Sequence, residues 1–343
     1  MSKEKIFLTK SSTNVRPLSW QISLTRWGLG ITEQILPELA AHWAAGLFLT
    51  PHRHTRPTRE QELLAQAEGF DINWHGSRLA AWQWGRGPTV LLVHGWEGRG
   101  AQLGSFIPQL VTAGFRVVAF DGPGHGDSAG NRSSMVELAD AIKTVANVVG
   151  EIEGVVAHSM GTAATTLAIN AGLSVKRLVY LAPPIAVSDY LNRFARLLNI
   201  SPALHLRIQR RLEARFNMEM SALNSLTMAP NMTTPLLVFH DRQDFEVCWQ
   251  DGAALAGAWP YAKFVITTGL GHRRILHNRE VIAAAVAFLA GGEANEIAPH
   301  IAKIRTADET ADQTSEISSN RHSSQSPNST IRYQQLLHEL GWQ

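Results

Sequence analysis

A serine stands where an apolar run meets a helical pattern. A short run with an apolar centre, residues 153–158, leads to Ser159, and the Ala-rich segment 160–172 follows. The small residues Ala157 and Gly161, two positions before and after the serine, suit a sharp strand-to-helix turn that crowded side chains would block. The N-terminus of the following helix favours negative charge that develops at the serine. This pattern predicts that Ser159 is a nucleophile.

Three acidic residues follow the apolar run 235–240 and compete for the role of catalytic acid. They are Asp241, Asp244 and Glu246. A carboxylate that accepts a hydrogen bond from a histidine ring must lie on the turn beyond a strand rather than at its last residue, which favours Asp244. Asp241 is the alternative, and we expect Glu246 to face solvent or to cap the next helix.

A histidine suited to act as the base follows the run 263–268. His272 comes directly after Gly269-Leu270-Gly271, and two glycines allow a loop to place the imidazole over a serine. His277 is the alternative, but its position suggests the start of the closing helix. Serine, acid and histidine in this chain order are typical of nucleophilic acyl transfer assisted by a general base.

Two backbone N–H groups are expected to stabilise the oxyanion of a tetrahedral intermediate. One belongs to Met160, directly after the serine, and the other to Trp96, in the His94-Gly95-Trp96 loop that follows the run 89–93. His94 itself is expected to brace this loop rather than to act as a base.

The elements that must position these residues alternate between strand and helix patterns. After a hairpin that turns at 75–77, short apolar runs at 89–93, 116–120, 153–158, 177–181, 235–240 and 263–268 are separated by helical segments. Such alternation predicts an α/β fold with a mostly parallel sheet covered on both faces. Ligands bind such sheets at the carboxyl ends of the strands, where all the candidate residues lie.

Five motifs in this order resemble the α/β-hydrolase superfamily. They are HGWEG (94–98), DGPGHGDS (121–128), AHSMG (157–161), HDRQD (240–244) and GLGH (269–272). The resemblance is closest to the serine-nucleophile branch of monoglyceride-lipase and serine-aminopeptidase type. It implies an eight-stranded, mostly parallel sheet with a small helical cap after the sixth strand. It also implies that the 121–128 loop, with Asp121, His125 and Ser128, is structural.

The chain divides into three zones. Residues 1–60 form an N-terminal extension, 61–291 the hydrolase domain with its cap at about 185–232, and 292–343 a polar tail predicted to be disordered that ends in a short helix. Two cap helices are expected, one with Ser188 as its N-cap and one with Ser201 as its N-cap and Pro202 as its first residue. Six cap arginines are expected to face solvent, and four cap methionines could line an acyl pocket or fill the seam with the core.

The N-terminal extension carries one amphipathic helix between residues 27 and 49. Its apolar side includes Ile35, Leu36, Leu39, Trp43 and Leu47. This side is wide enough that we expect it to pack on the body of the protein or on the cap, beside the mouth of the pocket. The alternative is a helix that lies on a membrane surface.

Composition limits the remaining possibilities. The chain has 343 residues, a formal net charge of +2 and one cysteine, Cys248. Scattered basic residues do not indicate a nucleic-acid partner, and no metal-binding spacing is present, so we expect neither metal nor cofactor. The sequence predicts a cytoplasmic serine hydrolase that cleaves carboxylic esters of a small-molecule acyl substrate, with unknown oligomeric state. The alternatives are an acyltransferase or thioesterase with the same triad, and a ligand-binding protein on a hydrolase fold.

Overall fold

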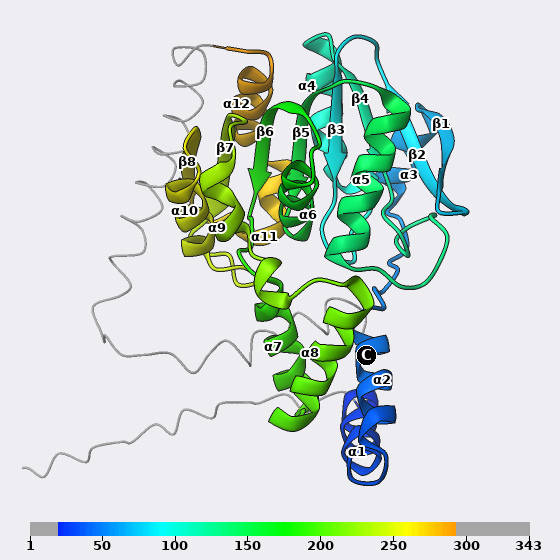
Figure 1. Ribbon diagram of the computed structural model, residues 1–343. Coiled ribbons are helices and arrows are strands. Elements are labelled where there is room, and N and C mark those ends of the chain that lie inside the picture. Colours follow the sequence, from blue (N-terminus) through cyan, green and yellow to red (C-terminus); the bar gives the residue numbers. More distant parts are fainter. Residues whose placement is uncertain (1–19, 293–343) are drawn as a thin grey trace, which may run out of the picture.

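The computed structural model describes residues 20–292, and its centre is an eight-stranded sheet (Figure 1). The strands are β1 (Glu68–Trp74), β2 (Ser77–Trp84), β3 (Thr89–Val93), β4 (Arg116–Phe120), β5 (Ile152–His158), β6 (Val175–Leu181), β7 (Leu236–Asp241) and β8 (Ala262–Thr267). Their order is β1-β2-β4-β3-β5-β6-β7-β8, with β2 antiparallel to both of its neighbours and the rest parallel. The predicted fold class is confirmed.

The hairpin between β1 and β2 turns where the sequence predicts. His75 and Gly76 adopt positive φ angles of 48° and 76°, and the side chain of Asn73 accepts a hydrogen bond from the Gly76 N–H at 2.9 Å. Left-handed backbone at two successive residues is what a tight hairpin requires, and glycine adopts it without strain.

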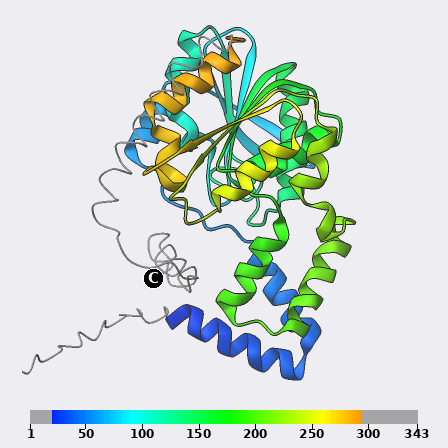
Figure 2. The ribbon, with the colours of Figure 1, turned by 90° about the vertical axis from the view of Figure 1, so that its left-hand side faces the viewer.

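Helices cover both faces of the sheet (Figures 1 and 2). One face packs against α5 (Met135–Val149), α6 (Met160–Asn170) and α10 (Trp249–Ala258), and the other against the 3₁₀ helix η1 (Gly100–Phe106), α3 (Thr58–Ala65), α4 (Ile107–Thr112) and α12 (Arg279–Leu289). The short α11 (Gly271–Arg274) and η4 (Ile275–His277) follow β8. Every residue of β3 is buried, as expected for a central strand covered on both sides.

The segment between β6 and β7 forms a helical cap, as predicted. It contains α7 (Val187–Leu198), α8 (Pro202–Phe216), η2 (Met220–Ala222), α9 (Ser225–Met228) and η3 (Ala229–Asn231). Ser201 caps α8 by accepting a hydrogen bond from the Leu204 N–H at 3.1 Å, which confirms that start. The prediction of Ser188 as an N-cap is wrong by two residues: the N-cap of α7 is Ala186, which a β-bridge with Asn224 holds extended, and the helix begins at Val187.

The N-terminal segment forms two helices, α1 (Trp20–Ile35) and α2 (Pro37–Phe48), rather than the one predicted. Pro37 begins the second helix, since proline disfavours helical backbone at the residue before it and suits the first helical turn. The two helices join α7 and α8 in a lobe below the sheet (Figure 1).

The prediction that this segment packs on the cap, beside the pocket, is confirmed: α2 contacts α8, α1 contacts α7, and Leu47 lines the pocket. The prediction that its large apolar side chains are buried there is wrong for three of them. Ile35, Leu36 and Leu39 are 70%, 55% and 52% exposed. The residues of α2 that are buried are four alanines, Ala40, Ala41, Ala44 and Ala45. Small side chains allow two helices to approach closely, so α2 presents its alanines to its neighbours. Leu39 near its start stays exposed, whereas Leu47 and Phe48 at its end pack against the core.

Within residues 20–292, no helix is both long enough and apolar enough to cross a membrane. The predicted polar tail and terminal helix lie outside the described residues.

Candidate active site

Ser159 lies at the carboxyl end of β5, on a sharp turn into α6. Its φ and ψ angles are 51° and −126°, a backbone conformation that is strained for a residue with a side chain. Hydrogen bonds hold the turn on both sides: the Ser159 N–H donates to the carbonyl of Leu181 in β6 at 2.9 Å, and the Ser159 carbonyl accepts from the N–H and the hydroxyl of Thr162. A side chain at Gly161 would collide with the carbonyl oxygens of Val93 and His94, which explains the glycine in this motif.

Asp244 and His272 form a buried pair at the same edge of the sheet. Nδ1 of His272 lies 2.7 Å from Oδ2 of Asp244, and both side chains are almost fully buried. The other oxygen of Asp244 accepts hydrogen bonds from the backbone N–H groups of Glu246 and Val247 at 2.8 and 2.9 Å. The carboxylate is therefore fixed by the turn after β7 and can in turn fix the imidazole.

Asp241, the alternative acid, makes hydrogen bonds within the loops after β7 and β8 instead. It is the last residue of β7, and its oxygens accept hydrogen bonds from the Gln243 N–H, the Thr267 hydroxyl and the Leu270 N–H at 2.9, 2.7 and 2.9 Å. These bonds tie the turn after β7 to the turn after β8. The alternative base, His277, contacts Ser105 at 2.7 Å, away from this pair.

Glu246 differs from the expectation that it faces solvent or caps a helix. Its side chain is 23% exposed, accepts a hydrogen bond from Nε of Arg273 at 3.0 Å, and has one oxygen 3.9 Å from Nε2 of His272. The reason is the tight turn at Asp244, which directs the following residues back toward the imidazole.

Asp244 and His272 each stabilise the charged form of the other, which shifts the pKa of both groups. Burial raises the cost of ionising Asp244, but the charge of His272 and the hydrogen bonds to the carboxylate hold its pKa well below the usual range. Burial alone would lower the pKa of His272, but the charge and hydrogen bond of Asp244, with a contribution from Glu246, raise it above its ordinary value. An imidazole in this environment accepts a proton more readily than one in water.

The loop after β3 approaches the serine closely. A Cβ on Gly95 would lie 2.9 Å from Cβ of Ser159, so only glycine allows this approach. Trp96 follows it, and both Trp96 and Met160 line the same pocket as Ser159. The two N–H groups chosen from the sequence thus belong to segments that flank the serine.

Two buried histidines brace this loop, as predicted for His94. Nε2 of His94 accepts a hydrogen bond from the Gly122 N–H at 2.8 Å, and Nε2 of His125 accepts one from the Glu97 N–H at 3.1 Å. Burial lowers the pKa of His94 to about 4 and that of His125 to about 3, so both rings stay neutral and can accept. Asp121, directly after β4, accepts a hydrogen bond from the Gly100 N–H at 2.8 Å and so links the loop after β4 to the segment that follows the Trp96 loop.

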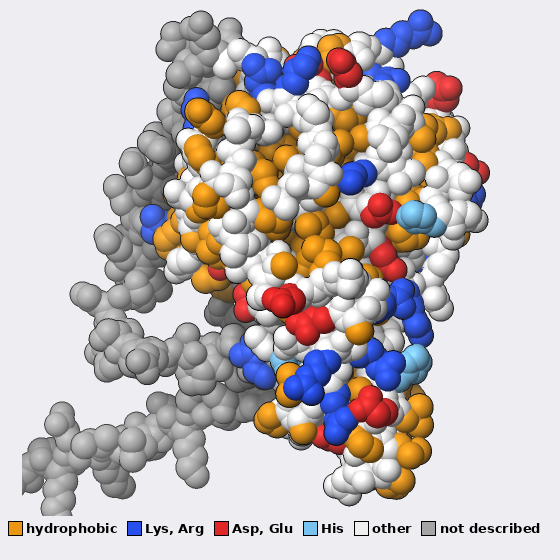
Figure 3. Space-filling model, in the orientation of Figure 1, with side chains coloured by type: hydrophobic (Ala, Val, Ile, Leu, Met, Phe, Trp, Pro, Cys, Tyr) orange, Lys and Arg blue, Asp and Glu red, His pale blue; other side chains and the backbone are white. Residues whose placement is uncertain are grey.

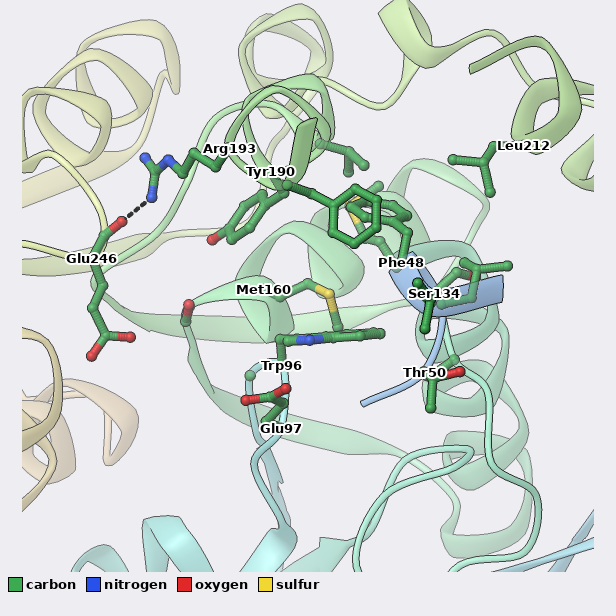
Figure 4. A pocket seen from close by; sticks show the side chains of 18 of the residues that line it. Phe48, Thr50, Trp96, Glu97, Ser134, Met160, Tyr190, Arg193, Leu212 and Glu246 are labelled. Carbon is green, nitrogen blue, oxygen red and sulfur yellow. Dashed lines mark hydrogen bonds between the residues drawn. The ribbon is translucent and has the colours of Figure 1, made fainter. Parts of the chain in front are cut away.

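A pocket of about 430 Å³ lies between the sheet and the cap, and Ser159 is one of its lining residues (Figure 4). The cap and the N-terminal helices supply a group of apolar side chains to its lining: Ile22, Leu47, Phe48, Val187, Phe194, Leu197, Leu198, Leu212, Phe216, Met218 and Met220. Two of the four cap methionines therefore line the pocket, whereas Met228 and Met232 are buried in the core cluster outside it.

Tyr190 lines the pocket although no sequence pattern predicts it. It projects from α7 toward the catalytic edge, and its hydroxyl is buried without a hydrogen-bond partner of good geometry (Figure 4). Burial raises its pKa, and the nearby Ser159 hydroxyl opposes that shift in part. Only the fold of the cap reveals this residue, since no motif surrounds it. Arg193, expected in solvent, is instead partly buried and donates to the Glu246 carbonyl.

Comparisons with known proteins agree with this arrangement. A sequence model described as the alpha/beta hydrolase family matches residues 90–285, more than half of the chain. Among curated proteins, the chain is 44% identical over 78 residues to a pimeloyl-[acyl-carrier protein] methyl ester esterase of Methylococcus capsulatus (22% of this chain, 28% of the relative). It is 33% identical over 96 residues to a pyrethroid hydrolase of Sphingobium wenxiniae (27% and 34%). It spans about a third or less of the length of these relatives.

Solved structures show similarity of fold. An esterase from Pyrococcus furiosus superimposes with a TM-score of 0.55 at 18% identity, covering 71% of this chain and 99% of the esterase. A bromoperoxidase from Bacillus anthracis superimposes with a TM-score of 0.51 at 16% identity, covering 65% of this chain and all of the bromoperoxidase.

Proposed function

The chain belongs to the alpha/beta hydrolase family, and within that family we propose that it cleaves carboxylic esters with Ser159 as nucleophile, His272 as base and Asp244 as acid. The observation that carries the proposal is the buried contact of 2.7 Å between His272 and Asp244, at the sheet edge where Ser159 occupies a strained turn. The family also contains enzymes with an aspartate nucleophile, and the serine at this turn argues against their chemistry.

The proposed reaction has two halves. His272 takes the proton of the Ser159 hydroxyl while the oxygen attacks the carbonyl carbon of the ester, and the N–H groups of Trp96 and Met160 stabilise the oxyanion, each by about 3–4 kcal/mol. The protonated His272 then gives its proton to the leaving alkoxide, which leaves an acyl-enzyme. Water, deprotonated by His272, attacks this ester, and the acid departs as Ser159 regains its proton.

The pocket indicates the kind of acyl group. Its lining of Leu, Ile, Phe, Val and Met side chains suits a hydrocarbon chain, whose burial is favourable by about 0.8 kcal/mol per methylene. With p-nitrophenyl esters of increasing length, kcat/KM should therefore rise by up to about fourfold per methylene until the pocket is filled. A flat dependence on chain length would contradict an acyl pocket at this position.

The nucleophile is tested with matched variants. Ser159→Ala and His272→Ala should each lower kcat by about 10⁴- to 10⁶-fold without loss of folding, because they remove members of one catalytic unit. His277→Ala is the control for the base and should keep wild-type turnover. A fluorophosphonate probe, followed by peptide mass spectrometry, should label Ser159 and not the neighbouring buried Ser133.

Labelling at another serine, or wild-type turnover by Ser159→Ala, would refute the assignment. Adding an alcohol or thiol acceptor to the same assay separates hydrolysis from acyl transfer, since a transferase forms the new ester or thioester at the expense of free acid.

A further inference from the structure

The N-terminal helices carry a continuous apolar face that the rest of the described chain leaves uncovered. Eight of the twelve large hydrophobic side chains exposed in residues 20–292 lie in this short segment: Trp20, Leu24, Trp27, Ile31, Ile35, Leu36, Leu39 and Trp43. We call this set the apolar face. Its five members on α1 recur every three or four residues, so they form one stripe along the helix. Trp20, Trp27 and Ile35 are 70%, 67% and 70% exposed.

The opposite side of α1 is anchored to the cap. Ile22 and Leu29 are 5% and 2% exposed, and the guanidinium of Arg26 donates to the Leu197 carbonyl at 2.6 and 2.8 Å. Glu33 accepts a hydrogen bond from Ser201. The helix is therefore held in place by its polar and inner side chains while its most hydrophobic side points away from the protein.

The contact between the two N-terminal helices is also specific. A Cβ on Gly28 would lie 2.9 Å from Cη2 of Trp43, so the glycine makes room for the indole. Because this contact fixes the angle between α1 and α2, the apolar face is a preformed surface rather than a loose helix end.

Arginines lie beside the apolar face on α8. Arg207 pairs with Glu38, next to Leu39 of the face, and Arg211 lies 3.7 Å from the same carboxylate. With Arg210 they line a surface cavity of about 550 Å³. Glu38 lies beside Arg207 and Arg211, and Glu213 on the same helix lies near Arg210. Two carboxylates cannot neutralise three guanidinium groups, so this border keeps a positive charge; Figure 3 shows blue atoms beside orange ones in the lower lobe.

Helix α1, which carries most of the apolar face, also forms part of the substrate pocket. Gln21, Ile22 and Thr25 of α1 line the same cavity as Ser159, together with Phe48 at the end of α2 (Figure 4). One turn of α1 thus contacts the pocket on one side and carries Leu24 of the apolar face on the other.

We propose that the apolar face of α1 and α2, with its arginine border, docks on a membrane surface that contains anionic phospholipid. Tryptophan is favoured at membrane–water interfaces, and arginines next to an apolar helix face bind anionic headgroups. Association of two copies through this face would bring two arginine borders to one interface, whereas anionic lipid neutralises them. Docking would place the pocket wall next to the lipid phase, from which an apolar ester could enter.

The proposal does not depend on chemistry at Ser159, so it is tested on the full chain carrying Ser159→Ala as well as on the wild type. Both are mixed with vesicles of phosphatidylcholine and phosphatidylglycerol in equal amounts, and the bound fraction is measured by flotation. We expect binding by both proteins. Vesicles of phosphatidylcholine alone, or added salt, should weaken it because the arginine contribution is electrostatic.

Substitutions separate the two components of the surface. Leu24→Gln with Trp27→Gln should lower the partition coefficient by at least about tenfold, since two large apolar side chains no longer enter the interface. Arg210→Gln with Arg211→Gln should lower it by about tenfold on anionic vesicles only.

Matched controls distinguish the face from exposed residues in general. Tyr261→Gln removes an aromatic side chain that is 62% exposed elsewhere, and Arg86→Gln with Arg279→Gln removes two exposed charges outside the lobe. Both controls should bind vesicles as the wild type does. Circular dichroism checks that every variant is folded.

Three results would overturn the proposal. The first is equal binding by the Leu24/Trp27 variant and the Tyr261 control. The second is that the wild type does not bind vesicles but sediments as a dimer, and that the Leu24/Trp27 variant sediments as a monomer. This result would make the face an interface between copies. The third is that vesicle binding appears only after residues 293–343 are deleted. In that case the occupant of the apolar face in the full chain would be that segment and not a membrane.

Discussion

Asp244 and Asp241 offer the sharpest test of the proposed chemistry, because the two carboxylates lie three residues apart and make different contacts. In Asp244→Asn the amide oxygen can still accept from the Glu246 and Val247 N–H groups. The amide nitrogen then faces Nδ1 of His272, which must become an acceptor. Its proton moves to Nε2, and the imidazole can no longer take the serine proton. We expect kcat to fall by about 10⁴-fold.

Asp241→Asn should instead cost stability. Its two oxygens accept from Gln243, Thr267 and Leu270, and an amide keeps only one acceptor, so at least one buried donor loses its partner. The loss is about 1–3 kcal/mol, which for a domain of this size lowers Tm by about 2–4 °C per kcal/mol. Turnover should change by less than about tenfold.

The assay measures kcat with a p-nitrophenyl ester and Tm by calorimetry for both variants. The reasoning fails if Asp241→Asn loses more activity than Asp244→Asn while folded, because the carboxylate that orients the base would then be Asp241.

Three further outcomes follow from the site. Catalysis needs neutral His272, whose pKa is raised, so kcat/KM should increase as pH rises through that pKa. Glu246→Gln removes a charge that helps to raise the pKa of His272, so the acid limb of the pH–rate profile should move to lower pH while activity is kept. Tyr190→Phe deletes a buried hydroxyl without a well-placed partner and should leave Tm unchanged or raise it, whereas a changed KM with constant kcat in the ester assay would identify a contact with bound substrate. Gly161→Ala would force a methyl group against the His94 carbonyl and should destabilise the protein by about 1–3 kcal/mol, seen as a lower urea midpoint; an unchanged midpoint would show that the turn can relax.

The sheet and the candidate triad could be predicted from the sequence because both depend on local patterns. Short apolar runs that alternate with helical segments permit few topologies, and the carboxyl ends of parallel strands meet at one edge. Ser159, Asp244 and His272 each follow such a run, so their proximity follows from strand order alone. Gly95 and Gly161 carry a similar local signal, since both occur where backbone segments must approach closely.

The choice between Asp244 and Asp241, and the surroundings of the pocket, depend on tertiary contacts. Asp241 is committed to Thr267 and Leu270 on a different strand and loop, which no local pattern reveals. Tyr190 reaches the site only because the cap folds over it. The N-terminal helices illustrate the same limit. Hydrophobicity predicted that their large side chains would be buried, but the residues of α2 that are fully buried are alanines, and Ile35, Leu36 and Leu39 remain exposed while Leu47 packs against the core. Periodicity shows that a helix has an apolar side, but the shape of its neighbours decides which side is buried.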